Sequence, residues 1–249
     1  MSSENTPDAL LSDKSIPIRD RLIFALDVPG PAEARQLVEE LGDSVSFYKM
    51  GLELFMAGDY YALLQWLVER GNKVFVDLKF FDVPQTVQSA VRQLARHGAT
   101  FATVHGNDAI LKAAASAKGD LKLLAVTALT SLDQGDIDDL GFQTDVRALV
   151  LSRARRALAA GCDGVISSGI EAPALRRELG PRFLVITPGI RPVKNTDDQK
   201  RTVDVEEAFR NGADYIVVGR PIREPADGST PRQAAEAIQR RIAALFAQP

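Results

Sequence analysis

Short apolar segments alternate along the chain with longer segments whose apolar positions recur at the helical period. The short segments are rich in Val, Ile, Leu and Phe, which is typical of strands buried on both faces. They predict eight strands, at residues 22–27, 45–50, 74–79, 101–105, 122–127, 164–168, 183–187 and 214–218. The longer segments predict helices at 31–41, 53–70, 84–97, 107–118, 144–160, 171–179, 205–211 and 231–246.

Eight strand–helix units in a chain of 249 residues predict an α/β fold, a single (β/α)8 barrel. The alternative is a doubly wound open sheet. The first expected strand, however, leads into "DVPGP" and not into a Gly-rich phosphate-binding turn. We expect residues 1–18 to form a partly mobile N-terminal arm and residues 19–249 to form the barrel. Glycines stand where helices should end, before the next strand, at Gly71, Gly98, Gly161 and Gly212.

Two stretches, 130–143 and 188–203, lack a regular period. Both follow expected strands, so both belong at the carboxyl-terminal mouth of the barrel, where active-site lids are found. We therefore interpret them as irregular loops over the mouth, and 188–203 as a candidate lid.

The charge balance favours neither nucleic acid nor membrane as a partner. The chain has 33 acidic and 30 basic residues, and no apolar run approaches the roughly 20 residues of a membrane span. The first residues, "MSSENTPDALLSDKSIP", lack the basic and apolar regions of a secretory signal. The one cysteine, Cys162, cannot form an intramolecular disulfide, which suits a reducing compartment. These features predict a cytoplasmic protein.

A few conspicuous residues have ordinary structural explanations. Cys162 has no histidine near it in sequence, so we interpret it as a small buried thiol. Phe55 and Trp66 fall at apolar positions of the expected helix 53–70 and are predicted to be core residues. His105, at a strand end, has two open interpretations, as a general acid or base and as a hydrogen-bonded wall residue.

Polar or special residues stand at the carboxyl end of every expected strand. In a (β/α)8 barrel this end carries the reactive side chains, and a purely structural barrel does not need them there. In strand order they are Asp27; Lys49; Asp77 and Lys79; His105; Thr127 and Thr130; Ser167 and Ser168; Pro188 and Arg191; Gly219 and Arg220.

The segment "VDLKFFDVPQTV" at 76–87 places three charges where an apolar strand emerges from the core. Asp77 and Lys79 are two residues apart on a strand and should therefore point to the same face. Asp27 and Lys49 end the two preceding strands and should lie close by. The sequence thus predicts an alternating array of acids and bases, and a salt-bridge network that only closes the barrel is the alternative.

A second cluster, "YIVVGRPI" at 215–222, ends the last strand. The phosphate site of such barrels usually follows the seventh and eighth strands. Gly219 and Arg220 offer backbone N–H groups and a guanidinium, which binds phosphate oxygens in a bidentate manner. Arg191 and Gln199, on the adjoining stretch, strengthen the prediction, although 192–201 also reads as a polar surface loop.

Taken together, these segments resemble the orotidine 5′-monophosphate decarboxylase family. "DLKFFDVPQT" is similar to its D-x-K-x-x-D-[IV]-P-x-T signature. The resemblance covers residues 20–223, and one departure, Gln85 where the family often has Asn, touches no residue needed for the chemistry. The other similar segments, in order, are "FALDVP", "YKMGLELF", "TVHG", "ALTSL", "VISSGIEA", "TPGIRP", "DDQKR" and "GADYIVVGRPI".

The resemblance implies a role for each charged residue of the array. Lys79 corresponds to the donor of a proton to C6 of the pyrimidine, and Asp77 to the carboxylate that faces the substrate's own carboxylate. Asp27 and Lys49 correspond to residues that hold the ribose hydroxyls and complete the charge array. Asp82, with Thr86, corresponds to residues that reach into a neighbouring subunit's site, which implies a homodimer with shared sites.

The resemblance also implies the remaining substrate contacts. Thr130 and Ser168 correspond to contacts near the pyrimidine ring, and Pro188 lies at the start of the lid. The phosphate contacts implied are Arg191, Gln199, Gly219 and Arg220.

The implied reaction converts orotidine 5′-monophosphate to uridine 5′-monophosphate, the last step of de novo pyrimidine nucleotide synthesis. It uses neither a cofactor nor a metal. Two rival hypotheses stay open: a metal-dependent decarboxylase or aldolase of the same superfamily that acts on a sugar phosphate, and a non-catalytic barrel that senses a nucleotide.

Overall fold

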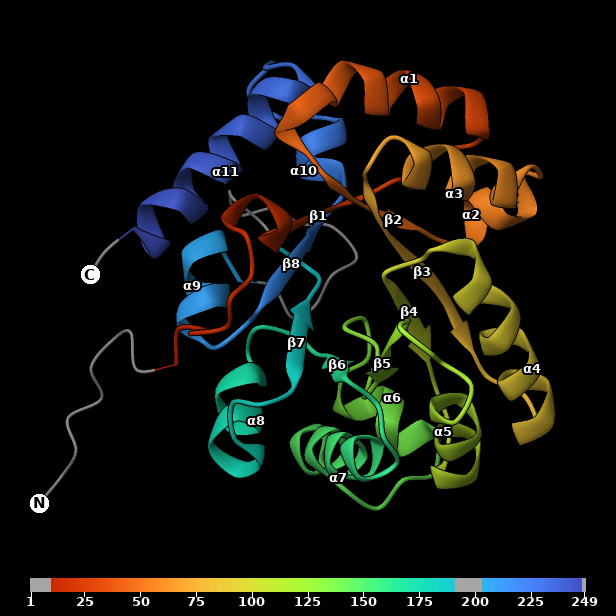
Figure 1. The fold of residues 1–249 in the computed structure, drawn as a ribbon. Helices are drawn as coiled ribbons and strands as arrows, with labels where there is room; N and C mark the ends of the chain where they lie inside the picture. The colour runs from red at the N-terminus through yellow and green to blue at the C-terminus, as the bar shows by residue number, and fades with distance from the viewer. Residues whose placement is uncertain (1–9, 191–202, 248–249) are drawn as a thin grey trace, which may run out of the picture.

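The strands form a closed parallel barrel, as predicted. The computed structural model describes residues 10–190 and 203–247. Each strand pairs with the next along the chain, and the last pairs with the first (Figure 1). The strands are β1 Leu22–Ala25, β2 Phe47–Met50, β3 Lys73–Phe80, β4 Phe101–Val104, β5 Lys122–Val126, β6 Gly164–Ile166, β7 Leu184–Thr187 and β8 Tyr215–Val218.

Helices surround the barrel (Figure 1). The major ones are α1 Pro31–Leu41, α3 Tyr60–Glu69, α4 Pro84–Leu94, α5 Asp108–Ala115, α7 Val146–Ala159, α8 Ala172–Leu179, α9 Val205–Arg210 and α11 Pro231–Phe246. Three short helices lie in the loops after β2, β5 and β8, namely α2 Leu52–Met56, α6 Gln134–Asp139 and α10 Arg220–Arg223. Within the described residues, no helix is both long and apolar enough to cross a bilayer.

Backbone conformation explains where the helices end. The four glycines expected at helix ends all have positive φ, between 76° and 99°, a conformation that glycine adopts without steric cost. The prediction of one helix over 53–70 is wrong, because Gly58 and Asp59 also have positive φ, 89° and 51°, and separate α2 from α3.

The break between α2 and α3 also explains why one of the two residues predicted to be in the core is not there. Phe55, on α2, is 41% exposed and packs edge-on against Tyr60. Trp66, on α3, is partly buried against the core, with the guanidinium groups of Arg35 and Arg70 both 4.6 Å from its ring centre. The apolar period therefore identified the buried face of α3 but not that of α2.

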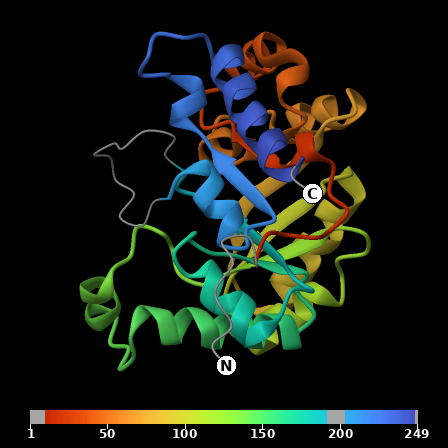
Figure 2. The same ribbon diagram turned by 90° about the vertical axis from the view of Figure 1, so that its left-hand side faces the viewer.

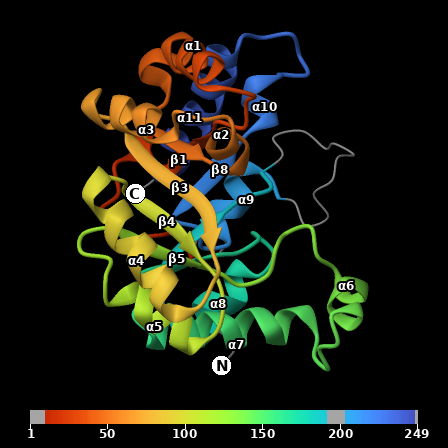
Figure 3. The ribbon, with the colours of Figure 1, turned by 90° about the vertical axis from the view of Figure 1, so that its right-hand side faces the viewer.

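The stretch 130–143 is not wholly irregular, because it contains α6. Asp133 and Asp136 form a reciprocal capping box at its first turn, and Ile137 is buried beneath it. Helix α6 projects from the body of the molecule beside the barrel (Figures 2 and 3).

Two apolar layers hold the barrel. The outer layer lies between strands and helices, and the inner one fills the barrel itself. Aromatic rings dominate the inner layer, with Phe47, Phe101 and Tyr215 in mutual contact at centroid distances of 5.0–5.9 Å. Because inward-facing positions alternate along a strand, the residues two beyond Phe47, Phe75 and Phe101 face the interior one layer higher. Those residues are Lys49, Asp77 and Thr103.

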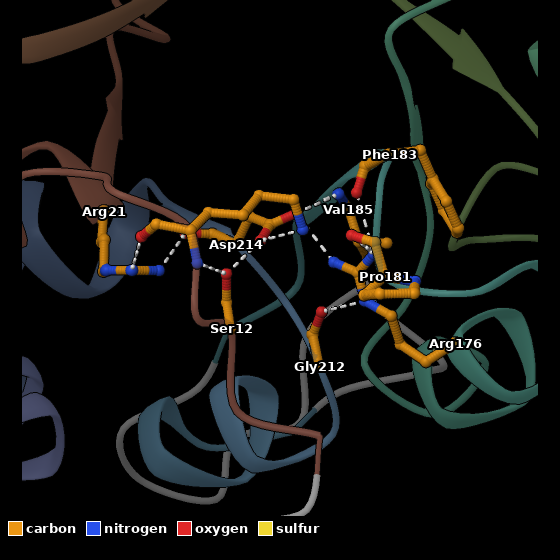
Figure 4. A network of polar contacts seen from close by, with 9 residues as sticks. Ser12, Arg21, Arg176, Pro181, Phe183, Val185, Gly212 and Asp214 are labelled. Carbon is orange, nitrogen blue, oxygen red and sulfur yellow. Dashed lines mark hydrogen bonds and ion pairs between the residues drawn. The ribbon is translucent and has the colours of Figure 1, made fainter. Parts of the chain in front are cut away.

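The opposite end of the barrel is closed by residues 10–17. Ile16 packs against the inner apolar layer. Ser12 donates a hydrogen bond to the Asp214 carboxylate over 2.5 Å, and Lys14 forms a 3.0 Å ion pair with it. The other Asp214 oxygen accepts hydrogen bonds from Arg176 over 2.7 Å and from the Val185 N–H over 2.9 Å (Figure 4). This part of the predicted arm is thus bound to the barrel through one buried carboxylate.

Candidate active site

A cavity of about 500 Å³ lies at the carboxyl-terminal end of the barrel. Its lining comes from strand ends and from the loops that follow them, so residues far apart in sequence converge there. Of the residues predicted from the sequence it includes Asp27, Lys49, Asp77, Lys79, Thr130, Pro188, Gly219 and Arg220.

The four charged residues from the first three strands form one connected array. Lys79 Nζ lies 2.9 Å from Asp77 Oδ1. Lys49 Nζ lies 3.0 Å from Asp27 Oδ1 and 3.6 Å from Asp77 Oδ2. The order Asp27, Lys49, Asp77, Lys79 therefore alternates in sign, as the spacing predicted.

Asp77 is held ionised at the centre of this array. Burial by itself raises the pKa of a carboxyl group, but the ammonium groups of Lys49 and Lys79 and hydrogen bonds from Lys79 and Thr103 outweigh it. The net effect holds the pKa of Asp77 below its usual value. The carboxylate side chain is only 15% exposed, whereas that of Lys79 is 37% exposed toward the cavity.

Strand periodicity is only part of the reason that Lys79 meets Asp77. Lys79 has φ 49°, in the left-handed region, and the pairing of β3 with β4 is irregular between Val76 and Phe80. A non-glycine residue in this region is strained, and such strain often marks a functional site. The sequence carried no signal for this conformation.

The basic side of the cavity lies after β8. Gly219 precedes α10, which begins with Arg220, and both residues line the cavity together with Pro188. Arg223 also lines it and donates a hydrogen bond to the Asp27 carbonyl. Sequence reasoning missed Arg223, although a spacing of three residues from Arg220 on a helical turn is a usable signal.

Several predicted residues lie outside this cavity. Asp82 and Thr86 are exposed at the start of α4, and Asp82 accepts a hydrogen bond from the Val83 N–H over 2.6 Å. Ser168 is buried and donates a hydrogen bond to Glu171. Arg191 and Gln199 lie outside the described residues.

The two remaining chemical candidates have mainly structural surroundings. His105 packs against Phe81 with ring centres 5.2 Å apart and lines a smaller cavity. Cys162 is buried, and burial raises the pKa of its thiol to about 12, as expected for an inert thiol. In the part of the chain that the structure describes, no three His, Cys, Asp or Glu side chains are grouped so as to hold a metal.

The fold and the cavity define the class as a (β/α)8-barrel enzyme with a charged centre and an arginine-lined side at its carboxyl-terminal mouth. A comparison with family models gives the family. The model of the Orotidine 5'-phosphate decarboxylase / HUMPS family matches residues 20–238, and the chain belongs to this family.

Individual relatives agree with this assignment. The chain is 66% identical to the orotidine 5′-phosphate decarboxylase of Methylococcus capsulatus, over 95% of this chain and 98% of the relative. It is 53% identical to that of Xanthomonas euvesicatoria, over 92% and 94%. Among solved structures, the orotidine 5′-phosphate decarboxylase of Lactobacillus acidophilus superposes with a TM-score of 0.79 at 35% identity, over 90% of this chain and 99% of that one.

Proposed function

We propose that this protein decarboxylates orotidine 5′-monophosphate to uridine 5′-monophosphate in pyrimidine biosynthesis. The observation that carries the proposal is the array of Asp27, Lys49, Asp77 and Lys79 inside the mouth cavity of a chain from this family. An ammonium group beside a buried carboxylate suits a reaction in which a carboxylate leaves and a carbon must be protonated.

In the proposed mechanism the bond between C6 and the carboxylate breaks, and its electron pair stays on C6 while CO₂ departs. The Lys79 ammonium stabilises this charge as it develops and then transfers a proton to C6. Asp77 opposes the substrate carboxylate, whose negative charge moves to C6 as neutral CO₂ departs. Solvent returns a proton to Lys79 after product release.

Substrate binding is assigned to the rest of the cavity and its surroundings. Asp27 and Lys49 hold the ribose hydroxyls, and Arg220 with the Gly219 N–H binds the phosphate. Binding energy at the phosphate is distant from C6 and can be used to hold the pyrimidine in its reactive position. The remaining assigned contacts are Thr130, Ser168, Pro188, Arg191 and Gln199.

The functional unit is proposed to be a homodimer in which Asp82 and Thr86 complete the partner's site. Both residues lie outside their own cavity, on a loop and helix start that are exposed. Their neighbours Phe81 and Val83 are large apolar side chains with 65% and 61% exposure, which is typical of a surface that a partner covers. Asp82 of one subunit then adds a second carboxylate beside the other subunit's Lys79.

A mixing experiment tests the shared site. Lys79→Ala and Asp82→Ala are each expected to lose activity. When the two inactive proteins are mixed and allowed to exchange subunits, hybrid dimers contain one intact site, and about a quarter of wild-type activity should return. If activity does not return although exchange is verified, Asp82 does not act across subunits.

The activity itself is tested by the absorbance of orotidine 5′-monophosphate, with and without EDTA. We expect the absorbance to fall at the same rate in both, because the proposed reaction uses no cofactor or metal. Sensitivity to EDTA would favour the metal-dependent rival, and binding without an absorbance change would favour the nucleotide sensor. The reaction is assigned to the cytoplasm, which agrees with the single buried thiol.

A further inference from the structure

Thr103 makes two hydrogen bonds that link the residues of the charged centre. It lies on β4, is fully buried, and occupies the inward position two residues beyond Phe101. Its Oγ1 lies 2.9 Å from Asp77 Oδ1 and 2.9 Å from the backbone nitrogen of Lys79. No sequence pattern singled out this residue, and it does not line the cavity.

Thr103 lies opposite the irregular part of β3. The ladder pairs Val76 with Ala102 and next pairs Phe80 with Val104, so three residues of β3 face one residue of β4. In this gap the Lys79 N–H cannot bond to a β4 carbonyl in the regular way. The Thr103 hydroxyl accepts that hydrogen bond instead, at the residue where the chain adopts a φ of 49°.

The direction of both hydrogen bonds follows from the groups involved. The Lys79 N–H can only donate, so the Thr103 oxygen accepts from it. The single hydroxyl proton then points to Asp77, whose ionised carboxylate can only accept. One hydroxyl thereby fixes the backbone of the lysine and the side chain of the aspartate at the same time.

We propose that Thr103 is a positioning residue, whose hydroxyl holds Lys79 in its strained conformation and orients Asp77, so that the Lys79 ammonium stays aimed into the cavity. The inference rests on the proposed function, in which Lys79 is the proton donor. A displacement of about 1 Å in a catalytic group can cost about 100-fold in rate, so this support has a kinetic consequence.

Substitutions at Thr103 can separate the effect of losing the hydroxyl from the effect of changing the side-chain volume. Thr103→Val keeps the shape but removes both hydrogen bonds, and we expect it to lower kcat about 30-fold with KM within about threefold. Thr103→Ser restores the hydroxyl and should remain within about threefold of wild type. If the valine variant does not fold, Thr103→Ala compared with Thr103→Ser isolates the same oxygen atom.

Thr187→Val is the matched control. Thr187 is also a fully buried threonine at the mouth end of a strand, β7. Its hydroxyl has no hydrogen-bond partner among the described residues. The same isosteric change there should leave kcat and KM unchanged.

The pH dependence of kcat separates the two explanations, because a general loss of packing does not shift its acid limb. Asp77 faces Lys49 from β2, Lys79 from β3, Thr103 from β4 and Tyr60 from α3. Thr103 stabilises the charged carboxylate, so Thr103→Val should raise the pKa of Asp77 and shift the acid limb of kcat to higher pH. Burial raises the pKa of Tyr60, which therefore stays neutral over this range.

The outcomes distinguish this inference from the proposed function. A slow Thr103→Val enzyme with a shifted acid limb, rescued by Thr103→Ser, supports the role. Equal losses in the valine and serine variants, or a valine variant within threefold of wild type, overturn it. If wild type does not decarboxylate orotidine 5′-monophosphate, or Lys79→Ala remains active, the proposed function itself fails.

Discussion

Asp77 and Asp214 are two carboxylates that each meet two cations, at opposite ends of the same barrel. Asp77 lies 2.9 Å from Lys79 and 3.6 Å from Lys49 at the mouth. Asp214 lies 3.0 Å from Lys14 and 2.7 Å from Arg176 at the closed end, where its side chain is fully buried. The ion pairs have similar distances, but their cations differ in exposure toward the cavity and in their ability to transfer a proton.

At the closed end, hydrogen bonds occupy one of the two cations, Arg176, and the other, Lys14, does not line the cavity at the mouth. Besides Asp214, Arg176 donates to the carbonyls of Gly212, Pro181 and Phe183 (Figure 4). At the mouth, Lys79 Nζ bonds only to Asp77 among the described residues and is 37% exposed. An arginine is effectively always protonated, whereas a lysine can give up a proton. The comparison teaches that an ion pair becomes chemically useful when its cation has a transferable proton and also an exposed side that faces a cavity.

The largest expected effect is on activity at the mouth. Lys79→Ala removes both the cation and the proton donor, so turnover should fall at least about 1000-fold. Asp77 keeps Lys49 and Thr103 as partners, and the protein should remain folded and bind uridine 5′-monophosphate. Steady-state kinetics and calorimetric titration check both parts, and residual activity above a few per cent would show that Lys79 is not the acid.

The next effect is on stability at the closed end. Asp214→Asn leaves the buried Arg176 and the partly exposed Lys14 without their counter-charge, which should cost about 3 kcal/mol of unfolding free energy. For a chain of this size the melting temperature should fall by roughly 6–12 °C, with kcat unchanged.

Asp108→Asn is the control for this prediction, because the pair of Asp108 with Arg156 is exposed. It should cost less than about 1 kcal/mol. A loss of kcat in Asp214→Asn at a temperature where the variant is fully folded would contradict the comparison, in which the closed end stabilises the fold and the mouth carries the chemistry.

A smaller effect is expected on the arginine side of the mouth. Arg220→Ala should lower kcat/KM by about 100-fold, or roughly 2.7 kcal/mol, because a bidentate phosphate contact is lost. The control is Arg232→Ala, which removes an exposed arginine of α11 and should change kcat/KM little. A loss below tenfold at Arg220 contradicts its role in phosphate binding.

The smallest effect concerns the backbone of Lys79. Because its φ is 49°, Lys79→Gly should be more stable than Lys79→Ala by about 1 kcal/mol, while both are inactive. At the exposed Ala244, within α11, the change from alanine to glycine should instead lower stability by about 1 kcal/mol. Denaturant titrations measure both differences, and the same sign at the two positions would show that Lys79 carries no strain.

Local sequence patterns were sufficient to predict those features that depend only on residues close together in the chain. The apolar segments predicted all eight strands, and the strand ends predicted Asp27, Lys49, Asp77 and Lys79. The alternation that buries Phe47 and Phe75 directs Lys49 and Asp77 inward. The prediction of one helix over 53–70 is wrong because Gly58 and Asp59, with positive φ, interrupt it. Helix α6 was not predicted, because a two-residue capping box is its main local signal.

By itself, the sequence determined the order of strands, the barrel and the end of it that carries chemistry, since periodicity and composition act over a few residues. Tertiary structure alone decided which distant groups meet. It brought Thr103 under Asp77 and Lys79, Arg223 against the Asp27 carbonyl, and Ser12 and Lys14 onto Asp214. Such contacts depend on strand register, on one left-handed residue and on the path of residues 10–17. No local pattern encodes them, because each depends on contacts between residues that are far apart in the sequence.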